Sequence, residues 1–487
     1  MRIISISGFV LAALLCVPAA WSQQSQSGQG GTTPTEPEQP LPASTPAPSG
    51  NGSGAVPAGR AVFGSSGDSS QQSSEEQSLP LSGAEQLVIP GTQPHDFFDA
   101  SALLSAAAYS DVITAQGQEV LGANEIAGGQ LLFDRSWREN RFTLAYSGGG
   151  EFFQPSALNP ASMYQTLSFA QSFGWKRWNL RLMDEFSYSP NSLFEGAGIG
   201  GPGLLSETGL GSTFTPVYSS TNTVLTVQTR VLNNSGVGEI QYNFSARSSF
   251  TITGSALLLD YLKGGYIDDH EYVGGAGYNY RLTPKDTLAV TYNISQMRYS
   301  GSPQSLIAQQ ANLAYSRQVT GRLVFQAGSG PELIAFHGYT PSIGNEVTWD
   351  ANVGLQYRLR RTTFGGTYSR GANPGSGIYF GSNTQYVTGS MIHQFSRRLV
   401  GAVNGGYSRN SSLANVPGVS NEYQNWFAGL SLGRQLGQHS HLSVNYGAFQ
   451  QPTGGICPVA GGCGTNRVYQ SLGLAFDVHM HRVGFAE

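Results

Sequence analysis

The sequence predicts an all-β chain that folds as a transmembrane antiparallel up-and-down β-barrel of about 18 strands. Three observations predict this fold. Apolar and polar residues alternate over long segments from about residue 97 to the end, which is the period of a strand with two different faces. Charged residues make up 11% of the chain, against about 25% in ordinary soluble domains. The connections between the segments are alternately short and long.

The first 22 residues have the features of a secretory signal peptide. Arg2 provides the basic start, and residues 3–17 form an apolar core that is too short for a membrane span. Ala20 and Ser22 are the small residues expected before a cleavage site. We therefore expect residues 1–22 to be removed and the mature chain to leave the cytoplasm.

Residues 23–96 consist mainly of Gln, Ser, Gly, Pro and Thr. Such a segment has too few apolar side chains to offset the entropy lost on ordering, so it is predicted to be a disordered linker. The barrel is then expected to occupy residues 97–487.

The alternating segments define the predicted strands. Alternation is clearest where Val347, Val353 and Tyr357 are separated by polar residues, weakest in 98–110, and 361–370 is rich in glycine. The predicted strands are 98–110, 124–134, 140–153, 162–174, 176–189, 237–247, 249–263, 270–282, 286–299, 305–317, 321–336, 345–359, 361–370, 384–396, 398–409, 422–434, 439–450 and 467–480.

The short connections are expected to be periplasmic turns, and the long ones extracellular loops. They include "TPKD", "TG" and the "SS" at Ser248 and Ser249. With both termini periplasmic, 18 strands require eight turns and nine loops, which the segmentation provides. A barrel of this size is wide enough for an aqueous channel unless something fills it.

A β-sandwich or a β-propeller could also contain many strands. The predicted strands, however, are about 10–14 residues long, the length that crosses a bilayer on a tilt. Tyr and Phe near their ends are typical of interfacial girdles. Lipid is the simplest cover for the apolar faces, and closure follows because an open edge in lipid would leave backbone groups unpaired.

The segment "SLGLAFDV" has the spacing of a barrel-insertion signal in the last strand, with Ser471, Gly473, Phe476 and Val478 at its key positions. On this motif and the strand pattern, residues of about 97–487 resemble bacterial outer-membrane β-barrels of the porin kind. The resemblance implies outer-membrane lipid and the barrel-insertion machinery as partners, and a linker in the periplasm. The chain departs from the family by continuing with "HMHRVGFAE".

The longest connection, 190–236, is expected to be the third extracellular loop, which in porins commonly folds into the lumen. Its apolar residues, among them Leu204 and Leu205, indicate that it packs inside the barrel, caps it or forms further strands. Glu195 and Glu207 are its candidate constriction acids. Leu257 and Leu259, which break the alternation by pointing inward, are a candidate contact for this loop.

Seven arginines share parity with inward polar residues and lie near the predicted turns: Arg141, Arg177, Arg181, Arg247, Arg281, Arg322 and Arg358. Acidic residues gather towards the outer loops: Asp111, Glu119, Glu151, Glu195, Glu207, Asp268, Asp269 and Glu422. One interpretation of the arginines is a cationic inner mouth that concentrates anionic solutes. The alternative is that they pair with lumen carboxylates or simply mark the periplasmic rim.

Four histidines in two i, i+2 pairs, His439 with His441 and His479 with His481, are weak metal candidates at the periplasmic end. We expect a frayed, exposed tail at these histidines rather than a metal site. Cys457 and Cys463 in "ICPVAGGC" are expected to form a disulfide in an oxidising compartment, and two thiolates alone fall short of the usual four ligands of zinc.

These observations favour a passive, water-filled pore for small solutes. The alternative is a non-conducting barrel that acts through its extracellular loops as a structural, adhesion or interaction protein. No Ser, His and Asp arrangement or phosphate-binding loop indicates an enzyme, and no cofactor is expected. The formal net charge of −4 gives no reason to expect a nucleic-acid partner.

Overall fold

The computed structural model describes the chain from residue 97 onward, with gaps. The described residues are 97–113, 119–137, 140–154, 162–189, 230–262, 266–339, 342–375, 377–414, 422–437, 439–450, 468–480 and 483–484. The predicted signal peptide, 1–22, and linker, 23–96, lie outside them and stay predictions. In the described ranges no helix combines the length and the hydropathy that a membrane span requires.

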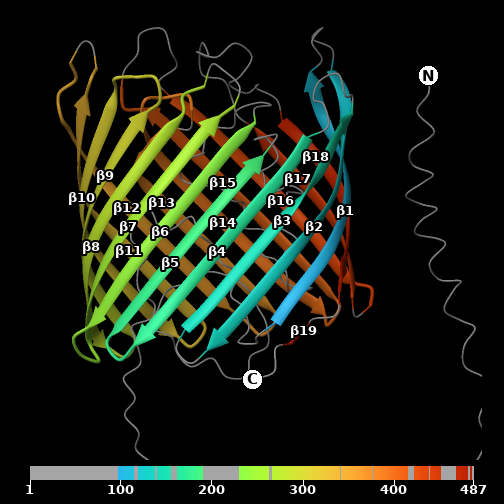
Figure 1. Ribbon diagram of the computed structural model, residues 1–487, viewed down its shortest axis with the longest axis horizontal. Coiled ribbons are helices and arrows are strands. Elements are labelled where there is room, and N and C mark those ends of the chain that lie inside the picture. Colours follow the sequence, from blue (N-terminus) through green and yellow to red (C-terminus); the bar gives the residue numbers. More distant parts are fainter. Residues whose placement is uncertain are drawn as a thin grey trace, which may run out of the picture. The chain divides into compact units, whose positions relative to one another are not determined.

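Eighteen long strands and one short strand follow one another along the described residues and form a single sheet (Figure 1). They are β1 (Phe97–Ile113), β2 (Glu119–Trp137), β3 (Asn140–Gln154), β4 (Ser162–Trp175), β5 (Trp178–Ser189), β6 (Val231–Asn243), β7 (Ser248–Tyr261), β8 (Asp269–Thr283), β9 (Asp286–Tyr299), β10 (Ser305–Thr320), β11 (Leu323–His337), β12 (Glu346–Arg358), β13 (Thr362–Asn373), β14 (Ser382–Ser396), β15 (Leu399–Ser412), β16 (Glu422–Gln435), β17 (Ser440–Gln450), β18 (Val468–His479) and β19 (Val483–Gly484).

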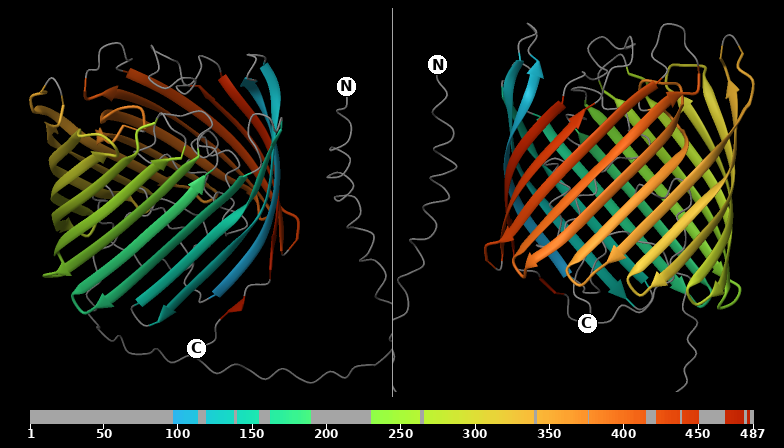
Figure 2. Two further views of the ribbon diagram at one scale, coloured as in Figure 1. Left: turned by 45° about the horizontal axis from the view of Figure 1, so that its top comes forward. Right: turned by 180° about the vertical axis from the view of Figure 1, so that it is seen from behind.

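Each long strand pairs antiparallel with the next, and β1 closes the ring by pairing with β18. The closing register runs from Ser101 opposite His479 to Tyr109 opposite Ser471. Figure 2 shows the closed, tilted wall from two further directions. Each of the eighteen predicted segments overlaps one of the long strands, in the predicted order, so the up-and-down barrel is confirmed.

Short and long connections alternate along the described chain. The end of the barrel with tight connections, such as Thr320 to Leu323, is called the short-turn end and lies at the bottom of Figure 1. The opposite end, where for example His337 connects to Glu346, is called the loop end. This alternation matches the predicted eight turns and nine loops.

The turn between β6 and β7 differs from the prediction. It occupies Phe244 to Arg247, whereas Ser248 and Ser249 begin β7. The Oγ atom of Ser245 accepts hydrogen bonds from the backbone N of Arg247 and of Ser248, both at 3.1 Å. A serine that bonds the backbone two and three residues ahead favours a turn over a strand, so β6 ends earlier than the alternation alone suggests.

The tail after Val478 is also partly explained. Val483 and Gly484 form β19, which pairs with the first two residues of β1, Phe98 opposite Val483 and Phe97 opposite Gly484. β1 begins at Phe97, but its pairing with β18 begins only at Ser101. Val483 and Gly484 therefore supply backbone partners for the first two residues of β1.

The two faces of the wall are clearest on β12. Trp349, Val353 and Leu355 are 45%, 36% and 44% exposed. The intervening Asp350 and Gln356 are each 8% exposed, because they face the interior. The predicted alternation is therefore the alternation between the outside of the barrel and its lumen.

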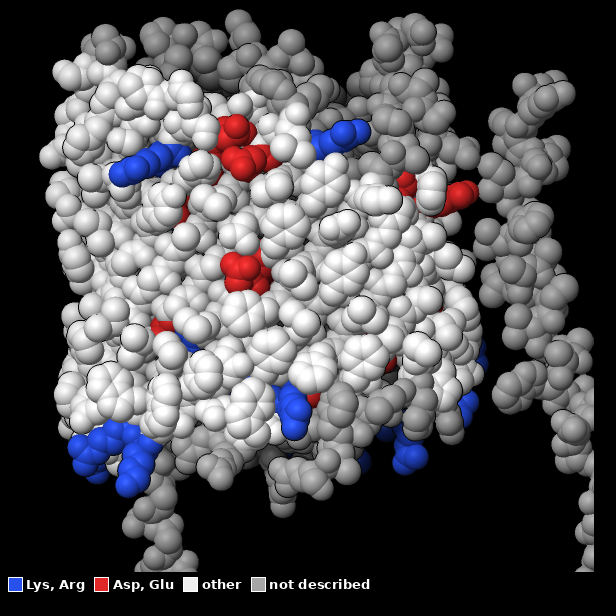
Figure 3. Space-filling model, in the orientation of Figure 1, with Lys and Arg blue, Asp and Glu red and all other residues white. Residues whose placement is uncertain are grey.

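The outer wall exposes a large apolar side chain on every one of the eighteen long strands. One from each strand in order is Leu104, Leu131, Leu144, Leu167, Leu182, Ile240, Ile252, Tyr278, Val290, Leu313, Leu333, Val353, Phe364, Val387, Val403, Leu430, Val444 and Leu472. Figure 3 shows few charged side chains across the middle of the visible wall, with Lys and Arg at its lower end. A continuous apolar belt of this kind has no counterpart on a soluble monomer and suits lipid.

Aromatic side chains gather on the outer wall at the short-turn end. Trp178 and Tyr242 have ring centroids 4.5 Å apart, and Tyr242 and Phe244 are 5.0 Å apart. Trp175 is 55% exposed on the neighbouring strand. Trp and Tyr at this height form the interfacial girdle expected of a membrane barrel. Asp184 of β5 is an acid on this outer wall, and it accepts a hydrogen bond from the Nδ2 atom of Asn234 at 3.3 Å.

Candidate functional site

The inner wall is polar and its side chains bond to one another. Across β13 to β16, Asn373 donates to Thr384, and Thr384 donates to Asn410 at 2.7 Å. Asn410 donates to Ser408 at 3.3 Å, and Ser408 donates to Asn425 at 2.7 Å. We call these five residues the polar ladder. All are at most 5% exposed, so the hydrogen bonds compensate for the water that each side chain has lost.

Residues 374–375 and 377–381, between β13 and β14, turn inward, and we call the connection 374–381 the inward loop, with Ser376 outside the described residues. Although they connect strands at the loop end, Ile378 and Tyr379 are only 4% and 3% exposed. The Oδ1 atom of Asn373 accepts a hydrogen bond from the backbone N of Gly375 at 2.9 Å and another from the Oγ of Ser382 at 2.5 Å. One side chain of the polar ladder thereby fixes both ends of the loop.

The inward loop makes contact with distant parts of the ring. At one side Gly377, with a φ of 74°, lies so close to Tyr261 of β7 that an added Cβ would be 2.4 Å from the ring. At the other side the ring centroid of Tyr379 is 5.6 Å from that of Tyr423 of β16. Nine strand intervals separate β7 from β16 in a ring of eighteen long strands, so the loop spans the lumen near its outer end.

The loop enters the lumen where the wall is incomplete. The pairing of β12 with β13 ends at Ala351 opposite Arg370, so the next part of β13 has no strand beside it on that edge. The carboxylate of Glu332, from β11, takes that place and accepts from the backbone N of Ala372 with both oxygens at 3.2 Å. Gln310 donates to the same carboxylate at 2.7 Å. A buried acid thus satisfies the backbone at the start of the loop.

We expect Glu332→Ala to destabilise this corner. The substitution removes the acceptor of two donors from a residue that is 0% exposed, and we expect a loss of about 2–4 kcal/mol in unfolding free energy. Urea unfolding in lipid vesicles would measure it, with Glu422→Ala on the exposed rim of β16 as the control. Equal stability of Glu332→Ala and the wild type would contradict this role.

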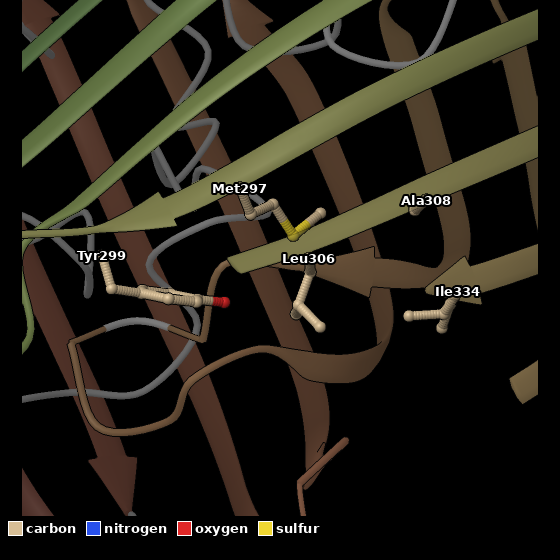
Figure 4. Packing of buried hydrophobic residues seen from close by; sticks show 5 residues of the cluster. All are labelled: Met297, Tyr299, Leu306, Ala308 and Ile334. Carbon is tan, nitrogen blue, oxygen red and sulfur yellow. The ribbon is translucent and has the colours of Figure 1, made fainter. Parts of the chain in front are cut away.

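An apolar cluster lies below the inward loop. Figure 4 shows Met297, Leu306 and Ile334 projecting from the wall to the same side as Tyr299. The ring centroid of Phe380 in the loop is 5.2 Å from that of Tyr299. Because all four wall residues are at most 3% exposed, the cluster anchors the loop by burying apolar area.

The seven predicted arginines fall into two groups. Arg141, Arg181, Arg281 and Arg358 occupy inward strand positions, whereas Arg177, Arg247 and Arg322 lie in short turns. The Nη2 atom of Arg141 lies 2.7 Å from the carboxylate of Asp134, and Arg181 lies 4.0 Å from Glu239. These two arginines meet lumen carboxylates. The effect of the seven on solute charge stays a prediction.

Several predicted site residues lie outside the described part of the chain. They include Glu195, Glu207, Leu204 and Leu205 of the long connection, the pair Cys457 and Cys463, and His481. The predicted loop 190–236 is too long by six residues, because Val231 to Gly236 form the start of β6, paired with β5. The constriction by the rest of the loop and the disulfide stay predictions. Leu257 and Leu259, the candidate contacts of that loop, are buried at 6% and 2% exposure, and Leu259 packs with Val231 and Tyr261.

Of the remaining histidines, His479 lies on β18 with its Nε2 atom 2.5 Å from Asp477 and its Nδ1 atom 3.5 Å from Asp99. His441 faces inward on the neighbouring strand, opposite Asp477, and the backbone carbonyl of His439 accepts from the N of His479 at 2.7 Å. Among the described residues, no group of three or more His, Cys, Asp or Glu side chains is arranged to hold a metal ion.

The residues of the candidate insertion signal lie on β18, the strand that closes the barrel. Ser471 is 4% exposed and shares the inner side with Gly473, whereas Phe476 and Val478 lie on the outer side, where Val478 is 40% exposed. Recognition by the insertion machinery stays a prediction.

Sequence reasoning missed the inward loop. The signal was present in "NPGSGIYFG", where three large apolar residues stand between glycines in a segment that connects two strands. An apolar triplet in an exposed loop would be unfavourable in water. The constriction was predicted in the much longer segment 190–236 because that segment contains more apolar residues.

Comparison with known proteins gives matches only at the level of structure. No protein-family model matches the sequence, and no curated protein matches it. The outer-membrane protein opdK of Pseudomonas aeruginosa matches with a TM-score of 0.40 and 10% identity over 79% of this chain and 99% of that chain. OccK2 of Pseudomonas aeruginosa, in complex with glucuronate, gives 0.41 and 11% over 80% and 98%. A BenF-like porin of Pseudomonas fluorescens gives 0.40 and 10% over 80% and 99%.

At such identity the likeness concerns architecture and gives no residue-by-residue correspondence in the lumen. The architecture itself rests on the strand order, the closing register and the exposed apolar wall described above. With these features, the described chain has the architecture of a closed, antiparallel up-and-down β-barrel with an apolar outer wall.

Proposed function

We propose that this protein is a passive, water-filled outer-membrane pore for small hydrophilic solutes, narrowed near its outer end by the inward loop, 374–381. The observation that carries the proposal is the division of the wall into an apolar outer face and a polar inner face on a closed ring of 18 long strands. A polar inner wall suits the passage of hydrated solutes, and a ring of this size has room for a channel.

The inward loop supports selection by size. Its contacts with Tyr261 and Tyr423 come from strands on opposite sides of the ring, so solutes would pass beside it. A second constriction, by the part of the predicted loop that precedes β6, is a further part of the proposal. The periplasmic position of the linker 23–96 also remains part of the proposal.

A second candidate is a barrel that does not conduct and acts through its extracellular loops. It is favoured by the tight burial of the inner wall, where Ser408 and Asn410 are 0% exposed and the cluster of Met297 and Leu306 is apolar. An interior packed to this degree would suit a scaffold as well as a narrow pore.

Solute entry into liposomes separates the two candidates. Vesicles that contain the purified protein should swell quickly in isosmotic glycerol and more slowly as the sugar becomes larger, from arabinose to a trisaccharide. Empty vesicles provide the baseline. Swelling at the baseline rate for every solute would favour the non-conducting barrel.

A further inference from the structure

Among the described residues, the arginines at inward strand positions are confined to one half of the inner wall. The arginines at inward strand positions lie in the halves of their strands nearest the short turns, as Arg141 and Arg281 illustrate. Inward carboxylates occur in both halves: Asp134 and Glu239 lie beside Arg141 and Arg181 near the short turns. Asp269 and Glu271 begin β8 at the loop end, and Glu332 lies in the outer half of β11. In the described ranges, the acids of the outer half have no arginine at an inward strand position beside them, so the ionised form of these acids attracts cations.

Asp269 is the most unusual of these acids. It is 0% exposed, and neither oxygen of its carboxylate has a hydrogen-bond partner among the described residues. Its cross-strand neighbours are Leu259 on one side and Tyr299 on the other. A carboxylate in such apolar surroundings is costly unless a positive charge or a donor compensates for it.

Glu271 repeats this arrangement two residues further along β8. Its cross-strand neighbours are Leu257 and Met297, which are 6% and 0% exposed. The electrostatic neighbours of Asp269 include Glu271 and Asp268, which are all acids. Two inward carboxylates therefore lie side by side, with apolar residues as their flanks.

Two tyrosines complete the surroundings. Tyr261 and Tyr299 are 6% and 3% exposed, their hydroxyl oxygens have no hydrogen-bond partner among the described residues, and both interact electrostatically with Asp269. Gly377 of the inward loop lies against the ring of Tyr261, and a Cβ on Gly381 would be 3.2 Å from the hydroxyl of Tyr299. The loop thus lies against both tyrosines.

Carboxylates beside aromatic rings suit an ammonium group. An ammonium has three N–H donors, which carboxylate and phenol oxygens accept, and its charge is attracted to aromatic faces. A divalent metal ion fits less well, because no set of three or more His, Cys, Asp or Glu side chains in the described ranges could hold one. An organic cation is therefore the ligand class that this group of side chains favours.

We propose that Asp269 and Glu271, with the rings of Tyr261 and Tyr299, bind the ammonium group of a small organic cation at the outer end of the lumen, beneath the inward loop. The proposal rests on the proposed pore, because the solute must enter the lumen to reach the site. Since Gly377 touches Tyr261, entry shifts the loop, and bound cations leave slowly.

Putrescine and adipate provide matched probes, because each has four methylene groups between two charged ends. Both ends of putrescine are positive ammonium groups, and both ends of adipate are negative carboxylates. Single-channel potassium currents of the purified full-length protein should show long interruptions with putrescine on the loop side and none with adipate. In Asp269→Asn/Glu271→Gln, which keeps side-chain volume, the putrescine concentration for half-block should rise about tenfold or more. Asp184→Asn, an acid on the outer wall of β5 that is not among the electrostatic neighbours of Asp269, is the matched control.

The outcomes separate the two proposals. A wild type that carries no potassium current overturns the pore. A wild type that conducts but is blocked equally by both probes, or a double variant that is blocked like the wild type, overturns the cation site. Calorimetric titration of the wild type with each probe gives a second test that needs no variant, and heat release with adipate alone would also overturn the site.

Discussion

Replacing the inward loop, residues 374–381, by an Asn-Gly turn is expected to raise single-channel conductance by about two- to fivefold, because a ring of this size encloses a wide lumen when nothing crosses it. The replacement suits the wall: Asn373 and Ser382 are directly paired across β13 and β14, so a two-residue turn can close the hairpin. Planar-bilayer recording of the purified variant would measure the change.

A milder variant and a control make this prediction specific. Tyr379→Ala with Phe380→Ala should give an intermediate conductance, because it removes the contacts with Tyr423 and Tyr299 and keeps the backbone of the loop. Tyr407→Ala, on the outer face at 40% exposure, should leave conductance unchanged. If the loop replacement folds into a heat-modifiable barrel and conducts like the wild type, the inward loop is not the constriction.

Val353→Arg is expected to lower the unfolding free energy by about 2–4 kcal/mol, because a guanidinium near the middle of the lipid-facing wall loses its water. Val353 lies in the middle of β12 and is 36% exposed on the outer side. Urea unfolding in phospholipid vesicles would measure the change in the midpoint and in the free energy.

The neighbouring residue provides the matched control. Asn352 precedes Val353 on the same strand and faces the lumen, half-buried, beside Gly328. Arginine there can extend into the aqueous interior, so Asn352→Arg should cost less than about half as much. Equal destabilisation by the two substitutions would mean that the outer face is not in lipid.

The barrel could be predicted because its two solvents impose a period of two residues on the sequence. On β12 the pattern of Val347 and Val353 against Asp350 and Gln356 placed each side chain on its correct face. Closure followed from the same fact, since lipid tolerates no free strand edge. Even β1, where the alternation is poor, is a strand because β2 and β18 flank it on both sides.

The turn between β6 and β7 shows where periodicity is insufficient. The alternation continues through Phe244 and Ala246, but Ser245 bonds the backbone ahead of it and starts the turn. The two hydrogen bonds that the hydroxyl oxygen of Ser245 accepts outweigh the weak preference of two apolar residues for a strand. The position of a turn thus depends on single side chains, which the two-residue alternation of apolar and polar residues does not reveal.

The inward loop could not be predicted from its length. Its path depends on contacts that are remote in sequence: Glu332 compensates for the missing strand beside Ala372, and Tyr261 receives Gly377. The inward position of Leu257 and Leu259 was evident from the broken alternation. Their neighbours Asp269 and Glu271 became evident only from the strand register.

The central claim is that the barrel conducts, and planar-bilayer recording of the purified wild-type protein tests it most directly. The account predicts stable, stepwise channels in potassium chloride whose conductance rises when the inward loop is replaced. A protein that is heat-modifiable and correctly inserted but electrically silent, with and without residues 374–381, would contradict the pore and favour a barrel that acts through its loops.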